Sequence, residues 1–346
     1  MATKKRVSSK KKSKEGGSYF DSPKPSSSFI SSGCKVLDLM LGGGWCKNRI
    51  INIVGDKSTG KTLLCIEAAA NFSRKYPDGK IIYRDCEAAF DENYAAALGM
   101  PIDRVDFGTR DEQLETVEDL FEELDELIKT SEVPTIYFLD SLDALSDRVE
   151  MSNDIDKATY GGSKPKQLSK TFRMLVRKLS KSNVTLVIVS QVRDKIGAMF
   201  GKKWSRSGGR ALDFYCSQVV YLAHIGLISK TVSGIKRPVG VKVKAKSEKN
   251  KVGLPFREAE FEITFGYGID DTLACLLWLK EAKSLDQIED FKNSTPEVEL
   301  RKFSKRLMEG DRAEYKAAMK KIRSTVSKRW YEIETSFLPK QSKYGD

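Results

Sequence analysis

The sequence predicts an α/β fold in which a mostly parallel β-sheet lies between helices, followed by a small helical C-terminal region. Three observations support this prediction. Short apolar, β-rich runs alternate with helical runs from Phe29 to about Phe265, a pattern typical of parallel sheets covered by helices on both faces. A glycine-rich segment, Gly55–Thr62, joins one such strand to a helix. From Asp270 onward, only helical periodicity remains.

Apolar runs of strand length predict the sheet. The predicted strands are Arg49–Val54, Lys80–Asp85, Thr135–Asp140, Thr185–Ser190 and Ser217–Ala223. Two later β-rich runs, Val239–Ala245 and Glu258–Phe265, are predicted hairpin partners at one edge of the sheet. These runs provide a sheet whose centre is parallel and whose last strands reverse direction.

Helical spacing of apolar residues predicts the covering layers. Within the core, the predicted helices are Lys61–Lys75, Gln113–Thr130 and Gln167–Ser182. In the second of them, one apolar face at helical spacing consists of Leu114, Val117, Phe121, Leu124 and Ile128. The C-terminal helices are predicted at Leu273–Lys280, Pro296–Met308 and Arg312–Ile333.

Composition narrows the class of partner. The chain has 346 residues and a formal net charge of +12, so nucleic acid is the first anionic partner to consider, although a solvated basic surface has the same composition. It has no apolar run long enough to span a membrane and no hydrophobic N-terminal signal. One histidine and six scattered cysteines argue against a zinc site and favour a reducing cytoplasm. Cys65, Cys86 and Cys275 are expected to be core residues.

Three regions are predicted along the chain. Residues 1–28 are rich in Lys, Ser, Gly and Pro and are expected to be a disordered basic arm, either weakly attracted to nucleic acid or a plain solubilising tail. Residues 29–269 are expected to form the α/β core. Residues 270–346 are expected to form a basic helical lobe, whose charge either binds duplex DNA or solvates the last helix.

The segment Gly55–Thr62 fits the phosphate-loop pattern, in which two glycines are followed by Lys-Thr. Its glycines let backbone N–H groups turn toward phosphates, and the following helix N-terminus favours negative charge. Lys61 is expected to reach the β- and γ-phosphates, and the Thr62 hydroxyl to hold Mg²⁺. ATP and Mg²⁺ are therefore the predicted cofactors, and the nucleotide-binding residues here are Gly55, Asp56, Lys57, Ser58, Thr59, Gly60, Lys61, Thr62 and Leu63.

Polar residues follow three of the predicted strands. Because the carboxyl ends of parallel strands face the ligand crevice, these residues are expected near the phosphates. Asp140 would act on Mg²⁺ through a water, and Glu87 would polarise the attacking water. Gln191 would bring a neutral amide close to the γ-phosphate.

Several segments resemble the RecA family of recombinases. The resemblance is carried by Glu87–Tyr94, Asp140–Leu145 and above all Gln191–Gly201, and it extends from about Ile30 to Gly268. The short N-terminus and the Tyr-Pro-Asp at residues 76–78 resemble phage UvsX-like members, so the chain is identified as a phage-encoded member of this family. The resemblance implies a RecA-like P-loop ATPase core.

The resemblance also implies roles for individual residues. Glu87 would activate the hydrolytic water, while Asp91 and Tyr94 would hold the adenine. Gln191 would sense the γ-phosphate and signal its presence to a DNA-binding loop. Lys249 and Lys251 would reach into the ATP site of a neighbouring subunit, although a solvated loop is the alternative for this pair.

Three departures from the family pattern are expected. Lys57 replaces an acidic residue of the phosphate loop, and Asp213 stands where a lysine supports the subunit interface. The N-terminal polymerising helix is largely missing. These differences bear on the strength of self-association more than on ATP binding.

Two loops are expected to contact DNA. The second, Arg193–Gly209, mixes glycines, cations and apolar side chains, the combination that single-strand binding needs. Its predicted contacts are Arg193, Lys195, Ile196, Met199, Phe200, Lys202, Lys203, Trp204 and Arg206. The first loop, Glu150–Lys166, is expected to contribute Tyr160 and Lys166, together with Arg173 beyond it.

The resemblance implies a DNA-dependent ATPase that forms a filament on single-stranded DNA and catalyses homologous pairing and strand exchange with duplex DNA. Single-strand-binding and loader proteins are further expected partners, and the bacterial cytoplasm, including that of a phage-infected cell, is the expected location. The alternatives are a helicase with the same core and a recombination mediator that does not hydrolyse ATP. A helicase of that kind would need a large N-terminal domain.

Overall fold

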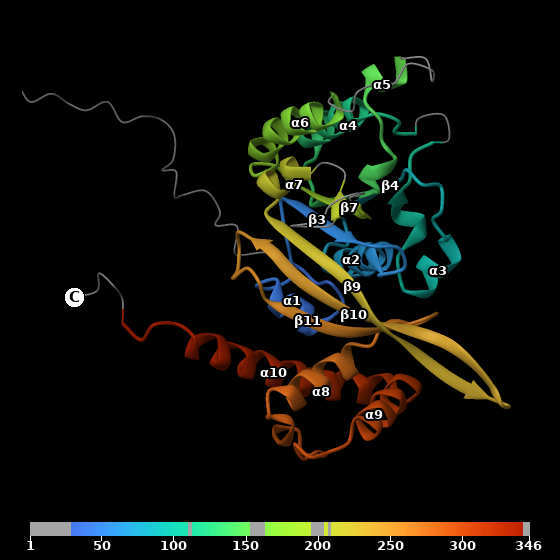
Figure 1. Ribbon diagram of the computed structural model, residues 1–346, viewed down its shortest axis with the longest axis vertical. Coiled ribbons are helices and arrows are strands. Elements are labelled where there is room, and N and C mark those ends of the chain that lie inside the picture. Colours follow the sequence, from blue (N-terminus) through green and yellow to red (C-terminus); the bar gives the residue numbers. More distant parts are fainter. Residues whose placement is uncertain (1–28, 110–112, 153–162, 195–203, 207–208, 342–346) are drawn as a thin grey trace, which may run out of the picture.

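The computed structural model describes residues 29–109, 113–152, 163–194, 204–206 and 209–341. Figure 1 shows the α/β core with a helical region packed at one end of its sheet. Two predicted segments fall outside the described residues. They are the first DNA loop around Tyr160 and most of the second.

The centre of the sheet is parallel, as predicted. Its strands run in the order β3–β7–β6–β4–β5, with bounds Ile50–Gly55, Val184–Asp194, Thr135–Asp140, Lys80–Asp85 and Val105–Asp106. Asn52 of β3 is fully buried, and its side-chain amide donates to the Ile188 carbonyl at 3.0 Å and to Ser190 Oγ at 2.8 Å on β7. This order places the carboxyl ends of β4, β6 and β7 near the loop that leaves β3.

Antiparallel strands extend the sheet on the other side of β3. β9 runs parallel to β3 and then pairs antiparallel with β10, followed by β11 and β12; their bounds are Gln218–Val232, Ile235–Asn250, Glu258–Thr264 and Gly268–Ile269. The predicted pairing of the two late β-rich runs is confirmed by the register of β10 with β11.

The hairpin of β9 and β10 is longer than the sequence predicted. Its outer half is exposed, so the apolar periodicity that marks the inner half is missing there. Backbone pairing continues regardless, from Ile228↔Gly240 out to Val232↔Ile235. Ser233 and Gly234 close the hairpin with φ of 52° and 80°, and two consecutive positive φ values match the twist of the paired strands.

Helices cover both faces of the sheet. One face carries α4 (Val117–Thr130), α6 (Ser163–Leu179) and α7 (Gly209–Tyr215), and the other carries α1 (Lys35–Met40) and α2 (Lys61–Lys75). α4 begins at Val117, four residues later than predicted, because Thr116 forms a capping box with Asp119. The Thr116 hydroxyl accepts from the Asp119 N–H at 3.2 Å, and the Asp119 carboxylate accepts from the Thr116 N–H at 3.0 Å.

Shorter elements complete the core. Within the described residues, the short strands are β1 (Phe29–Ile30), β2 (Trp45–Cys46) and β8 (Trp204–Arg206), and the short helices are α3 (Glu92–Ala97) and α5 (Arg148–Ser152). 3₁₀ turns are found at Ile102–Arg104 and Leu142–Ala144, and a further one, Leu285–Gln287, lies in the C-terminal region. Most of them connect the longer elements, and none was predicted as a separate element.

The predicted C-terminal helices are present. α8, α9 and α10 span Asp271–Glu281, Glu297–Glu309 and Arg312–Ser336, and they pack against the antiparallel end of the sheet (Figure 1). Buried residues of α10, including Met319 and Val326, belong to the same hydrophobic cluster as α1, α2 and β11. Arg301 also forms a two-point ion pair with Glu262 of β11, at 2.5 and 2.6 Å. The helical region therefore shares a continuous core with the sheet, and a domain boundary at residue 269 stays a prediction.

Two expectations from composition can be compared with the described residues. None of the described helices has the length and apolar character needed to cross a bilayer. Within the same residues, no group of His, Cys, Asp and Glu side chains is arranged to hold a metal ion. Cys65 and Cys275 are buried as expected, whereas Cys86 is only partly buried because it follows the last residue of β4.

Candidate functional site

The phosphate loop runs from the end of β3 into the first turn of α2. Gly60 is the residue before the helix and has φ +88°, and a Cβ there would overlap the Ile263 side chain. A Cβ on Gly55 would lie 2.5 Å from the Thr59 hydroxyl oxygen. Both glycines are therefore required by the shape of the loop. No side chain caps α2, so the N–H groups of its first turn are available to an anion.

Lys61 lies folded into this loop. Its ammonium donates to the Asp56 carbonyl at 2.7 Å, and the residue is only 9% exposed. Burial lowers the pKa of Lys61, an effect that the nearby carboxylates of Asp140 and Glu87 oppose. A polyphosphate bound in the loop would add further negative charge beside this buried ammonium.

Asp140 and Thr62 meet beside the loop. The Thr62 hydroxyl and the Tyr83 hydroxyl each donate to Oδ2 of Asp140 at 2.7 Å. Burial raises the pKa of Asp140, while the two hydroxyl donors lower it. A carboxylate next to a threonine hydroxyl at the end of a phosphate loop is the ligand set that Mg²⁺ uses with a nucleotide.

Glu87 is held by the ends of two neighbouring strands. Its Oε1 accepts from the Ser141 hydroxyl at 2.5 Å and from the Gln191 side-chain amide at 2.6 Å. The Gln191 backbone N–H in turn donates to Asp143 at 2.7 Å. The predicted residues Glu87, Asp140 and Gln191 are thus brought together by β4, β6 and β7. Sequence reasoning gave Ser141 no role, although its place directly after Asp140 was the available signal.

Asp85 shapes the loop that carries Glu87. Its carboxylate accepts from the backbone N–H groups of Glu87 at 3.1 Å, Ala89 at 2.8 Å and Phe90 at 2.8 Å. Three backbone donors on one carboxylate fix the path of the chain directly after β4. No function was predicted for Asp85, although the Asp-x-Glu spacing at a strand end pointed to it.

The remaining predicted nucleotide residues lie around this centre. Asp91 is the N-cap of α3, where its side chain accepts from the Tyr94 N–H at 2.9 Å, and Tyr94 is half-buried. Lys57 is exposed. Leu63 is 6% exposed and packs in the core, so only its backbone can face the loop.

Lys249 contacts its own chain. Its ammonium donates to the carbonyls of Asp213 at 2.5 Å and Phe214 at 2.7 Å, at the C-terminal end of α7. Lys251 is exposed, and so is Phe214, at 72%. The role of both lysines in a neighbouring ATP site stays a prediction.

β7, which carries Gln191, leads into the predicted second DNA loop. Val192 pairs with Arg206, and Asp194 with Trp204, so β7 and β8 form an antiparallel pair directly beyond Gln191. Arg193 lies between these pairs, opposite Ser205. Lys166 and Arg173 are exposed on α6. The other predicted DNA contacts lie outside the described residues: Tyr160, Lys195, Ile196, Met199, Phe200, Lys202 and Lys203.

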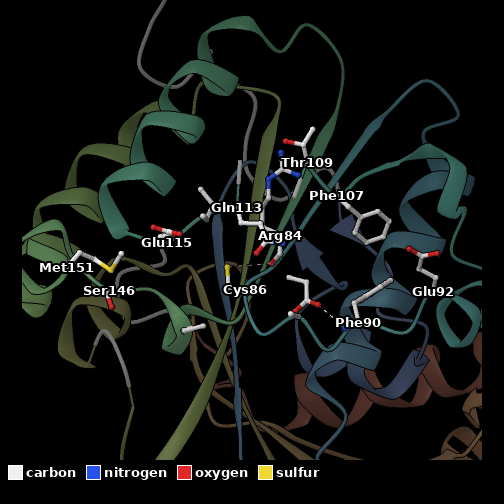
Figure 2. Close-up of a pocket in the computed structure, with 15 residues that line it drawn as sticks. Arg84, Cys86, Phe90, Glu92, Phe107, Thr109, Gln113, Glu115, Ser146 and Met151 are labelled. Carbon is white, nitrogen blue, oxygen red and sulfur yellow. Dashed lines mark hydrogen bonds between the residues drawn. The ribbon is translucent and has the colours of Figure 1, made fainter. Parts of the chain in front are cut away.

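A cavity of about 530 Å³ opens beside the loop that follows β4 and carries Glu87. Figure 2 shows Cys86 and Phe90 from the loop, with Phe107 and Met151 among the other lining residues. Arg84 is held there by ion pairs, at 2.6 Å to Glu123 and 3.2 Å to Asp106. Burial raises the pKa of Cys86 to about 12, so its thiol stays protonated at neutral pH and is a poor nucleophile.

Fold and site together define a P-loop nucleotide-binding protein. A phosphate loop joins a central parallel strand to a helix, and acidic and amide side chains converge on it from three neighbouring strand ends. The RecA N-terminal domain model matches residues 17–270, and the chain belongs to that family. The resemblance predicted from the sequence is confirmed, whereas the phage origin stays a prediction.

Curated relatives agree with this assignment. The chain is 38% identical over 252 residues to Protein RecA of Nostoc punctiforme, covering 73% of this chain and 67% of that protein. It is 36% identical over 252 residues to Protein RecA of Synechococcus sp. strain CC9902, covering 73% of this chain and 64% of that one. The match thus spans about two thirds of these relatives.

A solved structure supports the fold. The RadB recombinase superposes with a TM-score of 0.51 and 20% identity, and the match covers 70% of this chain and 98% of that chain. At this level of identity the likeness bears on the fold alone. The predicted fold class, a RecA-like core with a mostly parallel sheet between helices and a helical C-terminal region, is confirmed.

Proposed function

We propose that the protein is a DNA-dependent ATPase that assembles on single-stranded DNA as a filament and catalyses homologous pairing and strand exchange with duplex DNA. One observation carries most of the proposal. Beside the phosphate loop, Gln191 contacts Glu87 directly, and Asp140 contacts Thr62 of the helix that follows the loop. This is the arrangement that hydrolysis of a bound nucleoside triphosphate needs.

ATP and Mg²⁺ fit the residues present. The N–H groups of the first turn of α2 and the buried Lys61 ammonium suit the phosphates, and Thr62 with Asp140 suits the metal. Asp91 and Tyr94 are proposed to hold the base. Thr62 and Asp140 would hold Mg²⁺, which would supply positive charge to offset the negative charge that develops on the phosphates.

The chain's own groups position the reaction. Lys61 would leave the Asp56 carbonyl and pair with the phosphates. Glu87 would accept a proton from the attacking water, a role that suits an exposed carboxylate near the γ-phosphate. In the structure, Ser141 and Gln191 both donate to Oε1 of Glu87, so the proton would go to Oε2 unless one of these two contacts opens.

Coupling to DNA is proposed to run through β7. Gln191 contacts Glu87 and is followed at once by the pair Val192↔Arg206, where the cationic second loop begins and ends. Movement of that loop on a DNA strand would therefore act directly on Gln191. By linkage, ATP and DNA would each raise the affinity for the other by the same factor.

Self-association completes the proposal. Lys249 and Lys251 are proposed to act on a neighbouring subunit's nucleotide, which makes hydrolysis depend on assembly. For Lys249 this requires release from the carbonyls at the end of α7. Residues 1–28 are proposed to be a basic arm, 29–269 the ATPase core with its DNA loops, and 270–346 a basic helical lobe.

Three measurements test the proposal together. ATP turnover is measured with and without single-stranded oligonucleotide, negative-stain micrographs are recorded with both ligands, and strand exchange is followed between labelled homologous DNAs. We expect DNA-stimulated turnover, filaments and exchange. Turnover without exchange, accompanied by duplex unwinding, would point to the helicase alternative, and DNA binding without turnover would point to a non-hydrolysing mediator.

The second DNA loop has its own test. Phe200→Ala is expected to weaken single-strand binding by roughly 5- to 150-fold and to weaken strand exchange with it, since base stacking contributes about 1–3 kcal/mol per base. ATP binding without DNA should change less than twofold. Unaltered DNA affinity would reject the stacking role of this loop.

A further inference from the structure

A second cavity lies between the phosphate-loop helix and the C-terminal helices. Its volume is about 650 Å³, which is within the range of small-molecule sites. The second half of α2 forms one wall with Glu67 and Arg74, and the start of α10 forms the opposite wall with Arg312 and Lys316. None of the predicted site residues is among the residues that line it.

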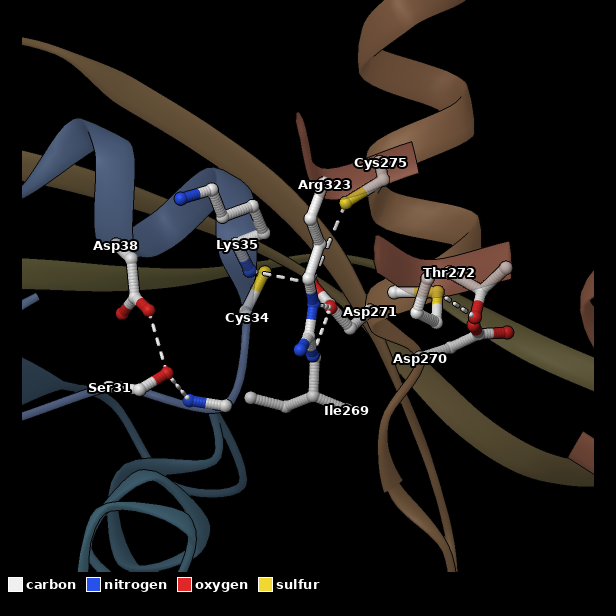
Figure 3. A network of polar contacts seen from close by, with 12 residues as sticks. Ser31, Cys34, Lys35, Asp38, Ile269, Asp270, Asp271, Thr272, Cys275 and Arg323 are labelled. Atoms are coloured by element: carbon white, nitrogen blue, oxygen red, sulfur yellow. Dashed lines mark hydrogen bonds and ion pairs between the residues drawn. The ribbon is translucent and has the colours of Figure 1, made fainter. Parts of the chain in front are cut away.

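Positive charge dominates the walls of this cavity. Arg74, Arg312 and Lys316 are exposed, and none of them forms an ion pair with another residue in the described part of the chain. Arg323, which also lines the cavity, forms an ion pair with Asp271 at 2.7 Å (Figure 3). Three cations from two separate helices therefore face one space without a direct ion pair, and Glu67 in the same lining attracts Arg74 without pairing with it.

Glu67 forms the floor. Two glycines close over its carboxylate, because a Cβ on Gly33 or on Gly268 would lie 2.6 and 2.7 Å from its two oxygens. The Ile269 N–H donates to it at 3.4 Å. Burial raises the pKa of Glu67 to about 7, so the carboxyl is partly neutral at physiological pH and opposes an anion less than an ordinary glutamate does.

We propose that this cavity is a second anion site, which binds a phosphate-bearing small molecule of up to nucleotide size. Arginine forks match phosphate oxygens in pairs, and a lysine adds a mobile third cation. Tyr267 and Tyr315 lie in the same lining and hydrogen-bond each other through their side chains, so one of the two hydroxyls keeps a donor that the ligand could use.

A ligand here would also touch the nucleotide site indirectly. Glu67 and Arg74 lie on α2, whose first residue is Lys61. A helix moves as a rigid body more readily than it bends, so an anion that draws the second half of α2 toward α10 would shift its N-terminal turn as well. The site is therefore placed to modulate ATP affinity, although binding itself does not depend on the proposed ATPase activity.

The binding test uses inorganic pyrophosphate and calorimetry on the full chain. Lys61→Ala is the background, because it disables the phosphate loop as a competing site. In this background we expect one saturable site. Adding Arg312→Gln and Lys316→Gln should weaken it at least tenfold. The matched control adds Lys320→Gln and Lys328→Gln, two exposed cations of α10 outside the cavity, and should change affinity less than twofold.

Three results would overturn the proposal. They are absence of saturable binding in the Lys61→Ala background, equal losses in the two double variants, and a loss confined to duplex DNA affinity. The first would mean that no second site exists, the second that only overall charge matters, and the third that α10 serves DNA. Repeating the titration with a nucleoside diphosphate distinguishes a plain phosphate site from one that also holds a base.

The pH dependence of pyrophosphate affinity tests the role of Glu67 independently. Glu67 is faced by Arg74 on its own helix, Asp271 of α8, Tyr94 of α3 and Tyr267 beside β12. Its carboxyl is protonated below pH 7 and charged above it, so it should disfavour the anion more at pH 8 than at pH 6. Pyrophosphate loses its own protons over this range, so affinities are compared with those of Glu67→Gln at each pH. The ratio of the pyrophosphate affinity of Glu67→Gln to that of the protein with Glu67 should grow at least threefold from pH 6 to pH 8. A constant ratio would show that Glu67 does not face the bound anion.

Discussion

Removal of the Asp85 carboxylate is expected to slow ATP turnover without weakening nucleotide binding. Asp85 accepts three backbone N–H groups, at 3.1, 2.8 and 2.8 Å, from the loop that carries Glu87. The carboxylate makes no hydrogen bond to the phosphate loop among the described contacts. Its contribution is to position Glu87, so the effect should fall on kcat.

The magnitude follows from the number of bonds. A hydrogen bond to a charged group contributes about 1.5–3 kcal/mol, and water replaces part of this on a half-exposed loop. About 2–3 kcal/mol of loop order would be lost in Asp85→Ala, and at about 1.4 kcal/mol per tenfold the ordered population falls roughly 30- to 150-fold. Asp85→Asn keeps one acceptor oxygen, so its loss should be roughly tenfold.

The assay measures DNA-stimulated turnover and, separately, the Kd of ATP without DNA. Asp78→Ala is the control, because Asp78 is an exposed carboxylate in the turn before β4. We expect kcat to fall in the order wild type, Asp85→Asn, Asp85→Ala, with the Kd of ATP within threefold throughout. Wild-type kcat in Asp85→Ala would refute the positioning role, and a large rise in Kd would show that Asp85 acts on the nucleotide instead.

Three further outcomes are expected. Glu87→Gln should bind ATP and DNA but lose at least 100-fold in turnover, as measured by phosphate release; near-normal release would exclude it as the base. Tyr83→Phe removes a donor that lowers the pKa of Asp140, so that pKa should rise and the acid limb of the turnover–pH profile should move to higher pH; an unmoved limb contradicts this. Mixed Lys61→Ala and Lys249→Ala subunits should recover part of the turnover that each lacks alone, and no recovery at any ratio counts against action between subunits.

Much of the fold could be predicted because its signals are local. The run Arg49–Val54 and the helix Lys61–Lys75 have apolar patterns and a phosphate loop between them, and the structure places β3 and α2 there almost unchanged. The outer half of the β9–β10 hairpin could not be predicted this way. Its pairing depends on a neighbouring strand and on the turn at Ser233, not on burial, so the sequence has no periodicity to show.

The candidate site was predictable in its membership but not in its contacts. The rule that parallel strands end at one edge of the sheet predicts that Glu87, Asp140 and Gln191 lie close together. It does not reveal that Ser141 and Gln191 both donate to the same oxygen of Glu87, since that depends on side-chain rotamers. Nor does it show that Lys249 caps the carbonyl end of α7 within its own chain.

Under the proposed function, the contacts of Glu87 with Ser141 and Gln191 would limit turnover by holding one oxygen of its carboxylate. The parallel ladder of β3, β7, β6 and β4 is buried and continuous, so it offers little freedom to move. Groups beyond the strand ends are less constrained, and Glu87 is exposed there while tied to Ser141 and Gln191. Under the proposed function, a γ-phosphate that attracts the Gln191 amide would remove one of these two donors. Hydrolysis would then depend on a single side-chain amide, which sits one residue before the strand pair that leads into the DNA loop.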